Sequence, residues 1–159
     1  MLQQLGNIYK KYRSLLSKPS LYFQTFDMEN VRLVLFDGVC NYCNNTINFF
    51  IRNDPNNLLK FATIQSETGQ KRLSKFNVNS KDDSIVFIDK GTVTTHATAI
   101  FNICKYLNWP VKVFYLLGFI PSFISNPIYK CIARNRYKWF GKKEQCMIPT
   151  DDIKNRFLD

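Results

Sequence analysis

From residue 31 onward the chain alternates between short continuous apolar runs and apolar residues at helical spacing. The β-branched run at 31–36 predicts a buried central strand, which the polar pair Asp37–Gly38 ends. Apolar side chains then recur on one helical face over Cys43–Arg52, and a following proline limits that helix. The same alternation predicts a strand at Leu58–Ile64 and a helix at Ser66–Phe76.

A turn signal separates the next two extended segments. Ser84–Ile88 and Thr92–Thr95 flank Asp89-Lys90-Gly91, a pattern that predicts a β-hairpin. Helices are then expected at Ala97–Leu107, at Val111–Gly118, at Ser125–Arg134 with Pro127 in its first turn, and at Asp151–Leu158 with Thr150 as its cap.

The order strand, helix, strand, helix, hairpin, helix predicts an α/β fold with a four-stranded mixed sheet flanked by helices, to which C-terminal helices are added. Since crossover connections are right-handed, the first two strands are expected to be parallel. The third strand should run antiparallel to the first, and the fourth parallel to it. This arrangement matches the thioredoxin-like core.

The length fits one domain, expected at residues 31–159, with a separate extension at residues 1–30. Apolar residues at helical intervals over Leu2–Leu16, followed by Lys18-Pro19-Ser20, predict that this extension is a basic helix. The other open interpretation is a transit segment, because residues 1–26 contain four basic residues and no acidic one.

The five cysteines and the N-terminal composition bear on where the protein works. The count is odd and the positions are scattered, unlike the disulfide framework of a small secreted protein, so a reducing compartment is expected. The N-terminus carries no apolar signal segment. We therefore expect a cytoplasmic protein, with an organellar location as the alternative.

The 22 Lys and Arg residues against 12 Asp and Glu residues give a net charge of +10, which favours acidic partners or an anionic membrane surface. The basic residues form only small clusters, so nucleic-acid binding is not expected. The most apolar stretch, Val111–Ile120, is interrupted by Lys112 and stopped by Pro121, short of the ~20 residues that span a bilayer. Peripheral membrane contact by this stretch is the remaining possibility.

The pair Cys40 and Cys43 carries the strongest chemical signal. It lies between a predicted buried strand and a helix, a context that favours redox chemistry over metal binding. Cys40 should be presented at the mouth of the helix, where the dipole stabilises a thiolate and the pKa of a cysteine falls from ~8.5 to about 3.5–7.5. Cys40 is therefore the expected nucleophile, and Cys43, one turn later, the resolving thiol.

A metal site is the alternative function. Cys40 and Cys43, joined by Cys146 or His96, would hold zinc or an iron–sulfur cluster. The chain contains a single C-x-x-C pair, whereas a closed zinc site needs four ligands. Dithiol chemistry itself needs no bound cofactor, so none is expected, and the expected partner is a disulfide-containing protein or small molecule.

Several residues near the pair have two possible roles. Asp37 either accepts a proton from Cys43 or hydrogen-bonds the amides of the turn. Gly38 is expected to permit a backbone angle or a close approach that a Cβ would forbid. His96, the single histidine, should lie at the Cys40 end of the sheet, where it either contacts the thiolate or begins a helix.

The remaining cysteines are assigned by their spacing. Cys104 and Cys131 align with apolar residues of predicted helices and are expected in the core. Cys146 follows a polar loop, and a third redox thiol, a metal ligand and a buried residue are all open for it.

Two motifs carry a family resemblance. The run V-L-F-D-G-V-C-N-Y-C, together with R-N-R-Y-K-W-F-G-K-K-E-Q-C-M-I-P at Arg134–Pro149, resembles the thiol–disulfide oxidoreductase DCC family, named for its Asp-Cys-Cys motif. The similarity runs from Val31 to the C-terminus, and implies a thioredoxin-like fold and a disulfide reductase activity. The matching residues are Asp37, Cys40 and Cys43 in the first motif, and Arg134, Arg136, Tyr137, Trp139, Phe140, Gly141 and Cys146 in the second.

The resemblance leaves the roles of the second motif open. Arg134 and Arg136 either clamp an anion or substrate near the thiolate or anchor the C-terminal segment through salt bridges. Trp139 and Phe140 are expected to pack in the core rather than form a docking surface. One departure from thioredoxin concerns the cis-proline before the third strand, where residues 80–84 read S-K-D-D-S, and this departure favours the metal alternative.

Overall fold

Four strands form one mixed sheet in the order β2-β1-β3-β4. The computed structural model describes residues 31–78, 85–142, 151 and 153–158, all within the unit Val31–Asp159. β1 pairs parallel with β2 and antiparallel with β3, and β4 runs antiparallel to β3, as the predicted topology requires. The strands are β1 (Arg32–Phe36), β2 (Leu59–Thr63), β3 (Ile85–Asp89) and β4 (Thr92–Thr95).

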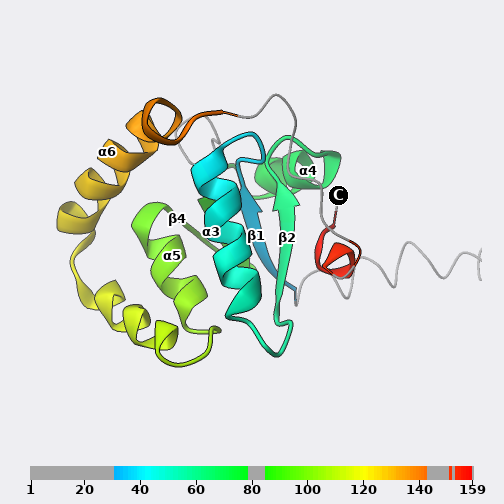
Figure 1. Cartoon of the computed structure of the whole chain (residues 1–159), viewed down its shortest axis with the longest axis horizontal. Coiled ribbons are helices and arrows are strands. Elements are labelled where there is room, and N and C mark those ends of the chain that lie inside the picture. Colours follow the sequence, from blue (N-terminus) through cyan, green and yellow to red (C-terminus); the bar gives the residue numbers. More distant parts are fainter. Residues whose placement is uncertain (1–30, 79–84, 143–150, 152, 159) are drawn as a thin grey trace, which may run out of the picture. The chain divides into compact units, whose positions relative to one another are not determined.

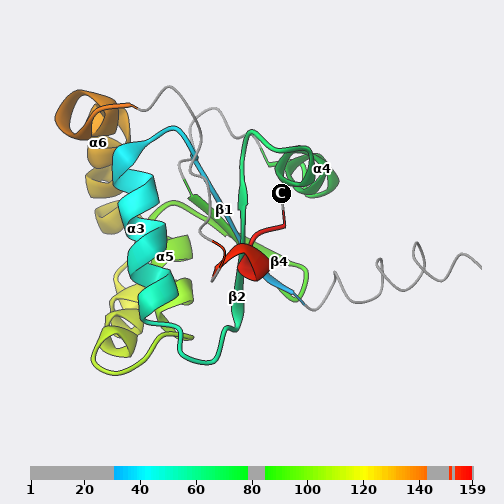
Figure 2. The same ribbon diagram turned by 45° about the vertical axis from the view of Figure 1, so that its right-hand side comes forward.

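Helices cover both faces of the sheet. α3 and α5 lie on one face and α4 on the other, as Figures 1 and 2 both show. η1, a 3-10 helix, and α6 follow α5 on its side of the sheet (Figure 1). The helical elements are α3 (Asn41–Arg52), α4 (Glu67–Lys75), α5 (His96–Cys104), η1 (Val111–Phe119), α6 (Ser122–Phe140) and η2 (Lys154–Arg156).

The central strand β1 is apolar throughout because both of its faces are covered. Val34 and Phe36 belong to the core cluster beneath α3 and α5, whereas Leu33 and Leu35 belong to the cluster on the α4 side. Successive side chains of a strand point to opposite faces, so a strand buried on both faces reads as a continuous apolar run. The thioredoxin-like prediction is confirmed.

The strand register brings several segments to one edge of the sheet. Phe36, the last residue of β1, lies opposite Thr63 at the end of β2 and Ile85 at the start of β3. Thr95, the last residue of β4, lies opposite Val86. The connection that carries Cys40 and the start of α5 therefore lie at the same edge.

α6 differs from its prediction at both ends. It begins at Ser122, directly after Pro121, so Pro127 lies inside the helix rather than in its first turn. Proline lacks the N–H that would bond the carbonyl four residues earlier, yet the helix continues past this position. Its last residue is Phe140, not Arg134, and it is followed by Gly141, whose φ of 78° favours glycine.

The predicted helix at Asp151–Leu158 is not present as such. The described residues of this segment form only the 3-10 turn η2, after which Leu158 N–H donates to the Phe61 carbonyl of β2 at 2.9 Å. Pairing of this segment with the outer strand β2 outweighs its local helical pattern. The expected cap Thr150 and the extension at residues 1–30 lie outside the described residues, so the domain boundary stays a prediction.

Candidate active site

Cys40 is the N-cap residue of α3. Its backbone is extended, and its Sγ accepts the N–H of Cys43 at 3.4 Å. Its carbonyl accepts the N–H of Asn44 at 3.0 Å, the first bond of the helix. The sulfur thus takes the position that a Ser or Asp side chain occupies at other helix starts, where unpaired N–H groups favour a negative charge.

Both sulfur-bearing side chains are buried. Cys40 is 0% exposed and Cys43 is 7% exposed. Cys40 forms an isolated antiparallel bridge with Lys142, and the Asn41 side chain donates to the Phe140 carbonyl at 3.0 Å. The end of α6 therefore packs over the start of α3, and the Cys40 sulfur lies at the helix mouth, as expected, without being presented to solvent.

Asp37 holds the turn before the cysteines through one carboxylate oxygen. Its Oδ1 accepts the N–H of Val39 at 3.2 Å and the amide of Gln65 at 2.9 Å. The same Gln65 accepts the N–H of Gly38 at 3.2 Å through its Oε1. These bonds fix the turn to Gln65, the second residue after the neighbouring strand β2.

The other oxygen of Asp37 faces α6. Arg136 Nη2 lies 2.8 Å from Asp37 Oδ2 in a largely buried ion pair, and the hydroxyl of Tyr137 donates to the same oxygen. Arg136 Nη1 lies 3.9 Å from Cys43 Sγ, within reach of a hydrogen bond to sulfur. One guanidinium therefore connects the carboxylate of the turn to the second cysteine.

Burial dominates the acid–base behaviour of the site. It raises the pKa of the Cys43 thiol from 9.0 to about 12, with the hydrogen bond and charge of Cys40 acting in the same direction and the cation of Arg136 opposing them. Burial and the bond to Asp37 likewise raise the pKa of Tyr137 to about 12. Cys43 is therefore a thiol and Tyr137 a hydrogen-bond donor at neutral pH.

The raised pKa of Cys43 predicts alkaline destabilisation. The unfolded chain ionises this thiol above pH 9 while the folded chain does not, so stability is complete below pH 9 and is lost as the pH rises toward about 12. At pH 10.5 the loss from this group is expected to be about 2 kcal/mol. Urea unfolding of the reduced protein between pH 7.5 and 10.5 measures it.

Two cysteine variants isolate this contribution. Cys43→Ala should lose less stability than the wild type across that pH range, by about 2 kcal/mol. Cys131→Ala is the matched control, because Cys131 is exposed. The free energy of unfolding of this variant should change with pH in parallel with that of the wild type. Coincident pH profiles of Cys43→Ala and the wild type would contradict the assignment.

The structure bears on one of the two roles expected for Gly38 and shows the helix start that was one of the two expected for His96. Among the described glycines a positive φ occurs at Gly91 and Gly141, so a left-handed angle does not explain Gly38. The Gly38 carbonyl instead accepts the Asn44 side-chain amide at 3.0 Å. His96 begins α5 with a φ of 58°, and its Nδ1 lies 2.8 Å from the Thr95 hydroxyl.

The residues of the second motif do not all lie at the site. Arg136 joins the site, whereas Arg134 is exposed on α6. The expectation that Trp139 and Phe140 pack in the core is wrong, because they are 54% and 46% exposed, and Phe140 stacks on Tyr42 at 4.8 Å. Of the other cysteines, Cys104 is buried as expected, Cys131 is exposed against expectation, and Cys146 lies outside the described residues.

Three residues of the site were not identified from sequence as site residues: Gln65, Asn44 and Tyr137. Gln65 had a usable signal, because it follows the strand parallel to β1 and such strands end at one edge of the sheet. Asn44, 3% exposed in the first turn of α3, is an unusual polar core residue that only its bond to Gly38 explains. Tyr137 matched the second motif without an assigned role, and no local pattern reveals its bond to Asp37 across 100 residues of sequence.

The described residues do not assemble the alternative metal site. Across the ranges that the structure describes, no group of three or more His, Cys, Asp or Glu side chains is placed to hold a metal ion. Cys146, the proposed third ligand, is not among them. The ring of His96, the other proposed ligand, meets that of Tyr129 edge-on at 5.4 Å.

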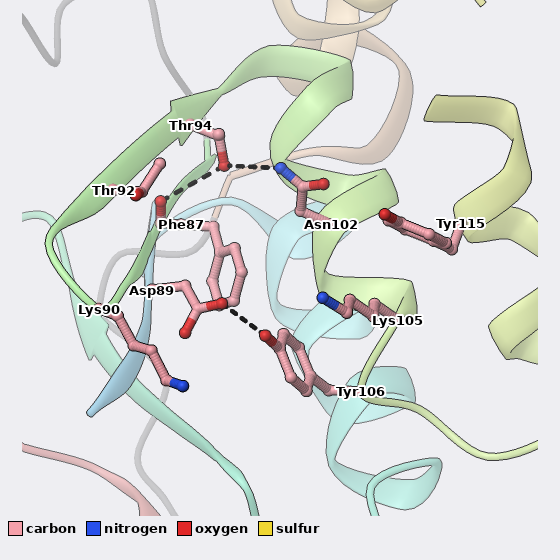
Figure 3. Close-up of a pocket in the computed structure, with 9 residues that line it drawn as sticks. All are labelled: Phe87, Asp89, Lys90, Thr92, Thr94, Asn102, Lys105, Tyr106 and Tyr115. Carbon is pink, nitrogen blue, oxygen red and sulfur yellow. Dashed lines mark hydrogen bonds between the residues drawn. The ribbon is translucent and has the colours of Figure 1, made fainter. Parts of the chain in front are cut away.

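Two cavities differ in their relation to the cysteines. A small apolar cavity of about 30 Å³ is lined by Cys43, Ile85, Ile100 and Tyr129, among others. A larger cavity of about 270 Å³ lies between the hairpin and α5, and Asp89 and Tyr106 are among the residues that line it. The Tyr106 hydroxyl points toward Asp89 and donates a hydrogen bond to its carboxylate at 2.5 Å (Figure 3). Since Asp89 and Ile85 are opposite ends of β3, the larger cavity is separate from the sulfur site.

Comparison with known proteins identifies the family of the chain. The family model of DCC1-like thiol–disulfide oxidoreductase matches residues 34–142. An uncharacterized protein, YuxK, of Bacillus subtilis is 46% identical over 128 residues, covering 80% of this chain and 93% of the relative. A chloroplastic DCC family protein of Arabidopsis thaliana is 33% identical over 124 residues, covering 76% of this chain and 72% of the relative. No solved structure matches. The chain therefore belongs to the DCC1-like thiol–disulfide oxidoreductase family.

Proposed function

We propose that the protein catalyses thiol–disulfide exchange with Cys40 as the attacking thiolate and Cys43 as the resolving thiol. The observation that carries the proposal is the N-cap position of Cys40, whose Sγ accepts the Cys43 N–H at 3.4 Å. The positive end of a helix of 12 residues favours the thiolate there. The second sulfur is one turn away, as ring closure to a disulfide requires.

The reaction has two thiol–disulfide exchange steps, each of which forms one S–S bond and breaks another. The Cys40 thiolate attacks one sulfur of the substrate disulfide, forms a mixed disulfide and releases the other half as a thiolate. Cys43 passes its proton to the thiolate released in the first step and attacks Cys40 Sγ, which releases the second half of the substrate as a thiolate and closes the Cys40–Cys43 disulfide. Two electrons have then passed to the substrate, and an external dithiol returns them to the pair.

Arg136 is proposed to prepare Cys43 for the second step. Burial raises the pKa of Cys43 and so disfavours its thiolate. The Arg136 guanidinium, 3.9 Å from the Cys43 sulfur, acts in the other direction because its positive charge stabilises the thiolate. The Arg136 guanidinium links the Asp37 carboxylate to the Cys43 sulfur. We therefore assign Asp37 a positioning role, in which it holds Arg136 and the turn in place. That assignment favours the hydrogen-bonding alternative for Asp37 over direct proton transfer.

Access to Cys40 requires a local opening. Its side chain is 0% exposed and its backbone is bridged to Lys142. A substrate disulfide therefore reaches the sulfur when the short pairing between Cys40 and Lys142 separates. Gly141 directly precedes Lys142 of this pairing, and its φ of 78° is a conformation that glycine adopts without strain.

The test is to trap the first intermediate. In a Cys131→Ser background, which removes the exposed thiol, Cys43→Ser should form a stable mixed disulfide at Cys40 with a small aromatic disulfide, located by peptide mass. The wild type should accelerate dithiothreitol-driven reduction of insulin. The proposal fails if no adduct forms on Cys40 and the wild type reduces insulin no faster than dithiothreitol alone. One equivalent of bound zinc in the purified protein would favour the metal alternative.

A further inference from the structure

The elements after α5 expose far more apolar surface than the rest of the described chain. Of the fifteen large apolar side chains exposed among the described residues, thirteen lie at residues 109–140. η1 buries only Val111 and α6 only Tyr129. We use the name η1–α6 face for six of these exposed side chains, which lie on η1 and the first part of α6: Val113, Phe114, Leu116, Phe119, Phe123 and Ile128.

Such a face needs a partner. Soluble monomers rarely expose contiguous apolar patches above a few hundred Å², and larger ones mark contact with a protein or a membrane. Phe119 is 80% exposed and Phe123 is 75% exposed, so both side chains lie almost wholly in water. Figure 1 shows η1 and α6, in yellow to orange, on the outside of α5 and away from the sheet.

The net charge of the chain is concentrated on a longer stretch that includes this face. Residues 90–143 contain nine Lys or Arg residues and no Asp or Glu, whereas the other 105 residues contain 13 basic and 12 acidic residues. Almost the whole net charge of +10 therefore comes from this third of the chain. Five basic residues between the start of η1 and the residues directly after α6 are exposed: Lys112, Lys130, Arg134, Lys138 and Lys142.

We propose that the η1–α6 face binds the surface of an anionic phospholipid bilayer. Large aromatic and aliphatic side chains interleaved with Lys and Arg are the composition of a segment that lies in the interface between headgroups and acyl chains. Nucleic acid would use the cations and leave Val, Leu and Ile without a role. Among the residues that the structure describes, no helix combines the length and hydropathy of a membrane span.

The face is hollowed toward the sulfur site. An apolar cavity of about 230 Å³ between α5 and α6 is lined by Ile120, Ile124 and Ile128 on the exposed side. Ile100 and Tyr129 line both this cavity and the smaller one at Cys43. Membrane binding would place the proposed redox pair beside the bilayer, but the binding itself uses none of its sulfurs.

Tryptophan fluorescence tests the proposal on the full chain. Both tryptophans of the protein, Trp109 and Trp139, are exposed at the two ends of this segment, at 79% and 54%. Vesicles of phosphatidylglycerol should shift the emission to shorter wavelength, and brominated acyl chains should quench it. Phosphatidylcholine vesicles should bind at least roughly tenfold more weakly, and salt should weaken the anionic binding.

Variants locate the surface. Phe119→Asp and Phe123→Asp should each weaken vesicle binding roughly tenfold or more, and folding should be unaffected because both side chains are exposed. Leu58→Asp, at an exposed apolar position outside the face, is the matched control and should bind like the wild type. Lys130→Glu with Lys138→Glu should also weaken binding, whereas Lys154→Glu should not.

Two outcomes overturn the proposal. Absence of binding to anionic vesicles does so, and a wild-type dimer in light scattering that Phe119→Asp converts to a monomer would then identify a second copy as the occupant. Equal binding of Phe119→Asp and the wild type also overturns it. Cys40→Ser should bind vesicles normally, so failure of the redox proposal and failure of this one are distinguishable.

Discussion

Replacing Cys40 by serine is expected to reduce the turnover of insulin reduction by at least roughly 10³-fold, because a residue that forms the covalent intermediate has no substitute in the site. A serine hydroxyl does not ionise near neutral pH, and it cannot exchange with a disulfide. The buried N-cap position of Cys40 should nevertheless tolerate serine, a preferred N-cap residue. The loss is measured as the rate of dithiothreitol-driven insulin precipitation.

The other cysteines supply the controls for this experiment. Cys43→Ser should also stop turnover, yet it should retain the first attack and accumulate the mixed disulfide at Cys40. Cys131→Ser, at an exposed position of α6, should stay within about twofold of the wild type. A Cys40→Ser enzyme that keeps more than a tenth of the wild-type rate would remove Cys40 from the mechanism.

Replacing Arg156 by methionine is expected to lower the free energy of unfolding by about 3–5 kcal/mol, the cost of leaving a buried charge without its partner. Arg156 is 4% exposed and is paired with Asp54, which is 1% exposed. Arg156 also donates to the carbonyls of Ile51 at 3.2 Å and Leu59 at 3.3 Å. The pair thus joins η2 to the end of α3 and the start of β2. Urea unfolding at neutral pH measures the change.

A neighbouring cation separates this effect from a general loss of charge. Lys154 lies in the same 3-10 turn and is exposed, so Lys154→Met should change stability by no more than about 0.5 kcal/mol. The double variant Asp54→Leu with Arg156→Met should recover part of the loss, because it removes the unpaired carboxylate. A loss below about 1 kcal/mol for Arg156→Met would show that the ion pair contributes little.

The family, the order of strands and the helix start at the cysteine pair were predictable from sequence. Each depends on local patterns. The apolar run before Asp37 fits only a strand covered on both faces, and Lys90–Gly91 takes positive φ angles at both residues, as a two-residue hairpin turn requires. The position of Cys40 at a helix start was predictable in the same way, since a few consecutive residues are enough to indicate where a helix begins.

The surroundings of the sulfurs were decided by contacts between distant segments. Arg136 and Tyr137 meet Asp37 across 99 and 100 residues, and the bridge to Lys142 helps to cover Cys40 where sequence predicted an open sulfur. A sequence shows that Trp139 is apolar, but only the packing of α6 shows that little lies against it. Local periodicity follows from the backbone of one element, whereas burial, ion pairing and pKa depend on which other element packs there, and that is a property of the tertiary structure.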